Sequence, residues 1–72
     1  MVPTAKRPQF LTAITAYARW CREHQVRYHT PDDRVSTVGR KYVHLRDRTG
    51  PLARYDLATG EVVITPRPEY WH

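Results

Sequence analysis

Residues 34–48 carry the sequence RVSTVGRKYVHLRDR, and the alternation within this run decides the fold. Successive side chains of a β-strand point to opposite faces of a sheet, so a strand here separates two sets of residues. One set is basic and aromatic: Arg40, Tyr42, His44, Arg46 and Arg48. The other set contains Val43 and Leu45, which we expect to anchor the strand in a core.

Three more strands are predicted around this run. The four expected strands are residues 34–38, 41–48, 52–57 and 61–65. Gly39 interrupts the first pair as a bulge or a tight bend, and Thr49-Gly50-Pro51 and Ala58-Thr59-Gly60 form turns. Such short connections require antiparallel pairing. In the third strand, simple alternation places Leu52 on the same face as Arg54 and Asp56.

An amphipathic helix is predicted over residues 8–25. Pro8 suits the first helical position, where its missing N–H is not needed. Apolar side chains recur at helical spacing and form a stripe: Phe10, Ile14, Tyr17 and Cys21. Arg19 and Arg22 lie on the opposite, polar side, as expected of a helix that packs on a sheet.

The expected fold class is α+β in one domain of 72 residues, with the helix packed on a strongly bent antiparallel meander of residues 34–65. An SH3-like barrel or half-barrel fits this pattern, and a flatter sheet with the helix on one face is the alternative. Residues 1–7 are expected to be a loose arm, and residues 66–72 an aromatic tail.

The composition is basic, with a formal net charge of +5 and twelve cations, of which ten are Arg. Arginine offers a planar fork of donors that suits phosphate and carboxylate groups, although a GC-rich genome would produce the same bias. No apolar run approaches the roughly 20 residues that span a bilayer, and the N-terminus does not resemble a signal peptide. We therefore expect a cytoplasmic protein without membrane contact.

The basic strand face is the best candidate site, and nucleic acid is the expected partner. The expected nucleic-acid-binding residues are Arg40, Tyr42, Arg46, Arg48 and Arg54, with Lys6 and Arg7 as an electrostatic arm. Tyr42 either stacks on a base or turns into the core. The simpler interpretation of the same pattern is a solvated outer face with weak surface ion pairs.

An acidic protein surface is the alternative partner. Arg19 and Arg22 on the helix, or Tyr70 and Trp71 in the tail, would then supply the contacts, since aromatic and Arg side chains dominate protein interfaces. Packing back onto the domain is the simplest interpretation of these terminal aromatic residues, and a homodimer contact is a further hypothesis.

Catalytic and metal sites are not expected. The chain lacks a glycine-rich phosphate loop and a nucleophile elbow, so we predict no enzymatic activity and no cofactor. Cys21, His24 and His29 lack the fourth ligand that a structural zinc site needs. Cys21 is more simply a small buried residue.

Residues 35–45, VSTVGRKYVHL, followed by residues 54–60, RYDLATG, resemble a pattern of small bacteriophage-encoded β-barrel proteins with an SH3-like fold. That pattern is V-x-x-V-G-R-K-Y and a hydrophobic residue, then an aromatic residue, Asp and a Thr-Gly turn. The resemblance implies a phage accessory protein in the host cytoplasm, some of whose relatives bind host machinery. The helix before residue 34 is not part of the pattern.

Overall fold

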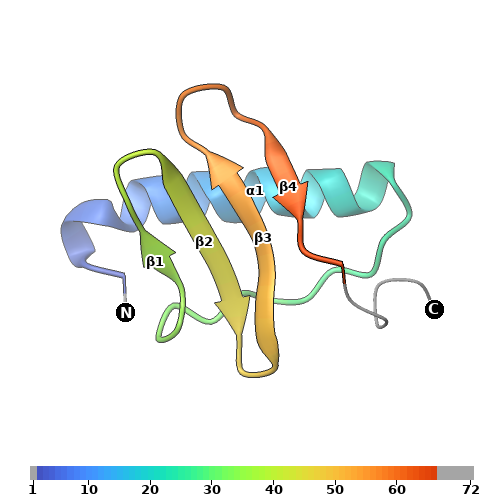
Figure 1. Cartoon of the computed structure of the whole chain (residues 1–72), viewed down its shortest axis with the longest axis horizontal. Coiled ribbons are helices and arrows are strands. Elements are labelled where there is room, and N and C mark those ends of the chain that lie inside the picture. The colour runs from blue at the N-terminus through green and yellow to red at the C-terminus, as the bar shows by residue number, and fades with distance from the viewer. Residues whose placement is uncertain (1, 67–72) are drawn as a thin grey trace.

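The helix and the strands form two layers in the computed structural model, which describes residues 2–66 (Figure 1). The elements are η1 Thr4–Lys6, α1 Arg7–Glu23, β1 Thr37–Val38, β2 Tyr42–Asp47, β3 Gly50–Asp56 and β4 Val62–Ile64. The four strands form one antiparallel sheet in the order β1-β2-β3-β4. The predicted α+β class and meander are confirmed. The sheet is open, because β1 and β4 lie at opposite edges and do not pair with each other, so the expectation of a closed SH3-like barrel is wrong.

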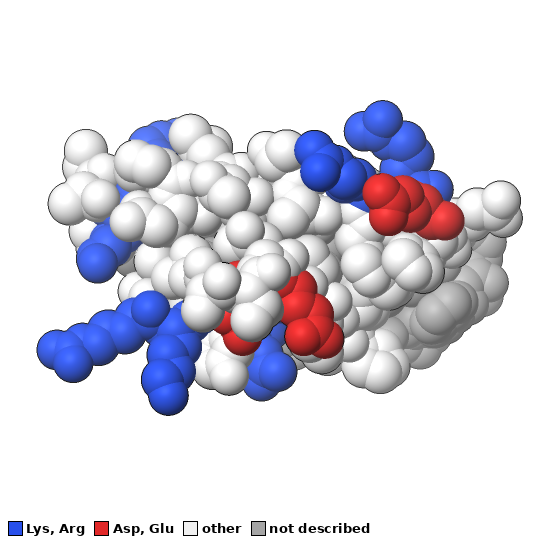
Figure 2. Space-filling view, turned by 90° about the horizontal axis from the view of Figure 1, so that it is seen from above, with Lys and Arg blue, Asp and Glu red and all other residues white. Residues whose placement is uncertain are grey.

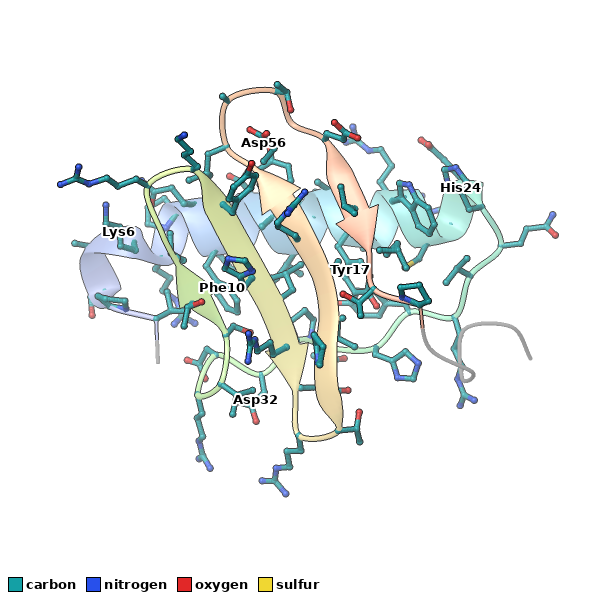
Figure 3. The ribbon with its side chains drawn as sticks, in the orientation of Figure 1. Lys6, Phe10, Tyr17, His24, Asp32 and Asp56 are labelled. Carbon is teal, nitrogen blue, oxygen red and sulfur yellow. The ribbon has the colours of Figure 1, made fainter. Side chains whose placement is uncertain are left out.

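Helix α1 crosses behind the sheet and covers one of its faces (Figure 1). Figure 3 shows Phe10 and Tyr17 between the helix and the strands. They pack with Val43 and Leu45 of β2, all four being buried, as the alternation predicts. Burial of each such side chain contributes about 1.5–3 kcal/mol to folding. No other described segment covers the opposite face of the sheet, which we call the outer face.

A β-bulge in β3 changes the predicted pattern of faces. Leu45 pairs with Ala53, but the next residue of β2, Arg46, pairs with Pro51, so Leu52 is the extra residue. A bulge lets two successive side chains point the same way, and both Leu52 and Ala53 are buried against α1. The prediction that Leu52 lies on the face of Arg54 is therefore wrong, because alternation assumes a regular strand.

Strand β1 is shorter than expected. The predicted strand of residues 34–38 is reduced to Thr37–Val38. Asp32 starts a turn instead, since its Oδ1 accepts a hydrogen bond from the backbone N–H of Arg34 at 2.9 Å. Ser36 follows this turn and is fully buried.

The helix ends at Glu23, before the predicted limit, and Gln25 follows it with a φ of 54°. Val26 N–H donates to the carbonyl of Cys21 at 2.8 Å, and Gln25 N–H donates to that of Arg22 at 3.4 Å. These two bonds define a Schellman motif, which terminates the helix. Among the described residues, no helix is both long and apolar enough to cross a membrane.

The N-terminal residues are more ordered than a loose arm. Val2 is buried in the core, and its N–H donates to the carbonyl of Asp33 at 3.1 Å. Residues 4–6 form η1, which leads directly into α1. This contact corrects the prediction for residues 2–7, and its cause is the apolar side chain of Val2. Residues 67–72, including Tyr70 and Trp71, lie outside the described part of the chain.

Candidate nucleic-acid interface

The outer face of the sheet brings together side chains from all four strands. Its members share the side of the sheet opposite α1: Thr37, Tyr42, His44, Arg46, Arg54, Asp56 and Val63. The register places Thr37 beside His44, His44 beside Arg54, and Arg54 beside Val63, so these four form one row across the sheet. The site is thus built on strands rather than on loops.

Arg54 and Tyr42 are in direct contact on this face. They lie on adjacent strands in diagonal positions, since Tyr42 pairs with Asp56 and Arg54 pairs with His44. The guanidinium carbon of Arg54 lies over the Tyr42 ring, 4.4 Å from its centroid, which is a cation–π geometry. Tyr42 is therefore on the outer face and not in the core, which settles the alternative that the sequence left open.

His44 adds a second ring to the outer face. The ring centroids of Tyr42 and His44 are 6.3 Å apart, with an angle of 56° between the planes. Both side chains are half-buried, whereas Arg54 on the adjacent strand is exposed. Arg46 follows on the same strand face and is also exposed. The result is a mixed aromatic and basic surface.

Asp56 is the acidic residue at the upper end of this face (Figure 3). Backbone N–H groups of Thr59 and Ala58 donate to its Oδ1 at 3.1 and 2.8 Å. These bonds hold the pKa of the Asp56 carboxyl below its usual range, so it stays ionised at neutral pH. The outer face thus carries the guanidinium groups of Arg46 and Arg54 and the carboxylate of Asp56. This carboxylate already accepts hydrogen bonds from the β3–β4 turn.

The other predicted nucleic-acid-binding residues do not join this surface. Arg40 lies in the β1–β2 turn, and Arg48 lies in the β2–β3 turn. These turns are at opposite ends of β2, whose six residues span roughly 17 Å. Gly39 causes the first departure, because its N–H bonds to the Tyr42 carbonyl at 2.8 Å and closes the hairpin before Arg40 can continue a strand.

The N-terminal cations, Lys6 and Arg7, also lie away from the outer face. Arg7 lies 3.8 Å from Asp33, and Arg48 lies 4.0 Å from Asp32, so each has an acidic neighbour. Lys6 is exposed at the end of η1. On the side of the molecule seen in Figure 2, the basic side chains lie in several separate groups, not in one patch. The predicted row of cations is therefore reduced to Arg46 and Arg54.

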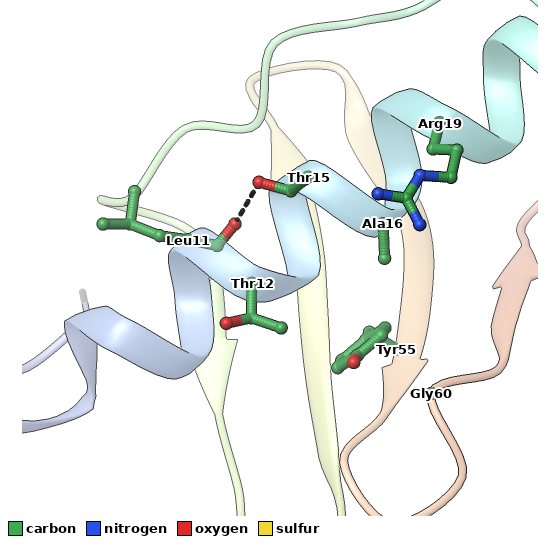
Figure 4. A pocket seen from close by; sticks show the side chains of 7 residues that line it. All are labelled: Leu11, Thr12, Thr15, Ala16, Arg19, Tyr55 and Gly60. Carbon is green, nitrogen blue, oxygen red and sulfur yellow. Dashed lines mark hydrogen bonds between the residues drawn. The ribbon is translucent and has the colours of Figure 1, made fainter.

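A shallow groove on the other side of the molecule was not predicted from the sequence. It lies between α1 and the β3–β4 hairpin, with a volume of about 440 Å³. Its lining residues are Leu11, Thr12, Thr15, Ala16, Arg19, Tyr55 and Gly60 (Figure 4). Arg19 thus lines a groove, while Arg22 is exposed in the last turn of α1. Leu11 is 50% exposed although it is apolar, and the helical pattern of the sequence does not reveal this exposure.

The residues weighed for a metal site have other contacts. Cys21 is buried, as predicted, and burial raises the pKa of its thiol. The His24 ring stacks on Trp20 at a centroid distance of 4.0 Å, and its Nδ1 lies 2.9 Å from the Trp20 carbonyl oxygen. Within residues 2–66, no three metal-ligating side chains gather in one place.

Comparison of the chain with protein-family models, curated protein sequences and solved structures gives no match. The resemblance of residues 35–45 and 54–60 to phage-encoded proteins therefore stays a prediction.

Proposed function

We propose that this chain is a non-catalytic, phage-like accessory protein that binds nucleic acid through the outer face of its sheet. The observation that carries the proposal is the contact between Arg54 and Tyr42, beside the ring of His44. Aromatic rings interleaved with cations are the usual means by which proteins hold nucleic acid without a deep pocket. The formal net charge of +5 favours approach of a polyanion.

The cations of the outer face have distinct positions for this role. Arg46 is exposed next to the bulge in β3 and can direct its planar fork at a phosphate. Arg40 and Arg48 at the two ends of β2 would add electrostatic attraction at longer range. The negative charge of Asp56 reduces this electrostatic attraction, but the N–H groups of Thr59 and Ala58 already donate hydrogen bonds to its carboxylate.

Fluorescence anisotropy with labelled oligonucleotides, at low and moderate salt, tests the proposal. We expect binding that weakens log-linearly with salt concentration. Arg46→Ala should reduce the slope by about 0.7–0.9, the contribution of one phosphate contact. Arg22→Ala is the matched control, because it removes the same charge from α1, on the side away from the outer face. Absence of binding at low salt, or equal effects of the two substitutions, would contradict the proposal.

A second candidate function is binding of a host protein as an inhibitor or adaptor. The groove beside α1 favours it, since half-exposed Leu11 and the guanidinium of Arg19 offer apolar and charged contacts along the same groove (Figure 4). Leu11→Asp and Arg19→Ala should then abolish capture of a host protein, whereas Arg46→Ala should leave capture unchanged.

A further inference from the structure

The position of Arg54 over Tyr42 has consequences for the type of nucleic acid that fits. One side of the guanidinium faces the ring at 4.4 Å, and Arg54 is exposed, so its other side is open to solvent. The neighbours of Arg54 across the sheet, His44 and Val63, flank it on both sides. The contact with Tyr42 favours this arginine conformation before a ligand binds, so a ligand that uses it loses less side-chain entropy on binding.

A guanidinium held in this way offers a flat surface on which an aromatic ring can stack. Nucleobases stack on aromatic side chains and on arginine planes. The N–H donors of arginine lie at the edge of its plane, so stacking leaves them available for a phosphate or a base edge. The pair of Arg54 and Tyr42 therefore suits a base better than a phosphate alone.

The arrangement of Arg54 and the two rings limits how bases can occupy the face. Tyr42 and His44 are 6.3 Å apart between centroids. Arg54 covers one face of the Tyr42 ring, so the surfaces left for bases are the Arg54 plane and the His44 ring. Bases in a duplex also present only their edges. The geometry suits an extended strand whose bases are separated.

We propose that Arg54, backed by Tyr42, forms a stacking platform for an unpaired nucleobase, so that the outer face takes single-stranded rather than double-stranded nucleic acid. The inference rests on the proposed nucleic-acid binding and specifies its substrate class. The ring of His44, which pairs with Arg54 across β2 and β3, takes the next base of the nucleic-acid strand. In this arrangement Arg46 contacts the phosphate backbone, while Arg54 contacts a base.

Three labelled probes of equal length distinguish these contacts: a single-stranded oligonucleotide, the same strand with abasic sites, and the duplex. We expect the intact single strand to bind roughly 5- to 150-fold more tightly than the abasic strand, which corresponds to loss of one stacked base. The duplex should bind no better than the abasic strand. Equal affinity for the intact and abasic strands would overturn the stacking platform while leaving the proposed nucleic-acid binding intact.

Two substitutions isolate the platform. Arg54→Lys keeps the charge and removes the plane, so it should abolish the preference for the intact strand without changing the salt slope. Tyr42→Leu should do the same by removing the backing ring, provided that circular dichroism shows a folded protein. Arg22→Lys is the matched control, because Arg22 is exposed in the last turn of α1, away from the outer face, and should show the wild-type preference.

The pattern of results separates the two proposals. A wild-type preference in Arg54→Lys would overturn the platform. Failure of all three probes to bind at low salt would overturn the proposed function, and the platform with it.

Discussion

The hydroxyl of Ser36 lies 3.0 Å from the backbone nitrogen of Arg46 and occupies the place where β1 would otherwise continue beside β2. Its Oγ accepts from the Arg46 N–H and lies 3.1 Å from the Arg46 carbonyl and 2.8 Å from that of Asp32. The hydroxyl donates its single proton to one of these two oxygens. Ser36 thus fixes the backbone from which the Arg46 side chain projects onto the outer face.

Ser36→Ala should destabilise the fold by roughly 1–3 kcal/mol, because it leaves the N–H of Arg46 without its buried acceptor. Urea denaturation followed by circular dichroism measures this change. Thr37→Ala, which removes a neighbouring hydroxyl that is exposed, is the control and should change stability much less. Equal losses for both variants would contradict the role given to Ser36.

The sequence predicts the layers of this fold because periodicity reports burial. The helical stripe and the alternation around Val43 are confirmed, with Tyr17, Val43 and Leu45 fully buried. Both signals are local, since they depend only on which side of one helix or one strand a residue occupies. The predicted antiparallel order is also confirmed, because short turns allow no other connection.

The parts that the sequence does not reveal depend on contacts between segments. The bulge at Leu52 is a mismatch in register between β2 and β3, and alternation in one strand does not encode it. The contact of Arg54 with Tyr42 likewise requires the pairing of His44 with Arg54. Arg40 and Arg48 leave the face for the same reason, since turns rotate side chains away from the strand alternation.

Gln25→Gly should stabilise the protein by roughly 0.5–1 kcal/mol. Gln25 has a φ of 54°, a left-handed conformation that glycine adopts without steric cost. Thermal denaturation should show a higher midpoint for the variant. Glu23→Gly provides the contrast, because Glu23 is in the last turn of α1 and should lose stability on the same substitution. An unchanged or lower midpoint for Gln25→Gly would show that the Schellman motif is not strained here.

Asp56 should make the stability depend on acid pH. Its folded-state pKa is lowered by the N–H groups of Thr59 and Ala58, so its stabilising effect is full above the unfolded pKa and is lost as pH falls through the folded pKa. Asp56→Asn should therefore be less stable than the wild type at pH 7, and the difference should shrink below about pH 4.

Melting curves from neutral to acid pH measure this difference. Glu61→Gln is the control for net charge, because it removes one negative charge from the same hairpin without changing the Asp56 turn. A difference between Asp56→Asn and the wild type that stays constant down to the lowest pH would exclude the ionised carboxylate as its cause.

Leu52→Ala should cost about 2–5 kcal/mol, as removal of a fully buried leucine usually does. The bulge directs Leu52 toward α1, whereas a regular strand would direct it to the outer face and make the substitution nearly neutral. Denaturant unfolding therefore tests the bulge itself. Leu11→Ala makes the same change at a residue that is 50% exposed and should cost much less.

Because small domains have only about 5–15 kcal/mol of stability, Leu52→Ala should also populate the unfolded state and expose Cys21 to thiol reagents. Slow labelling of Cys21 in this variant, as in the wild type, would place Leu52 outside the core.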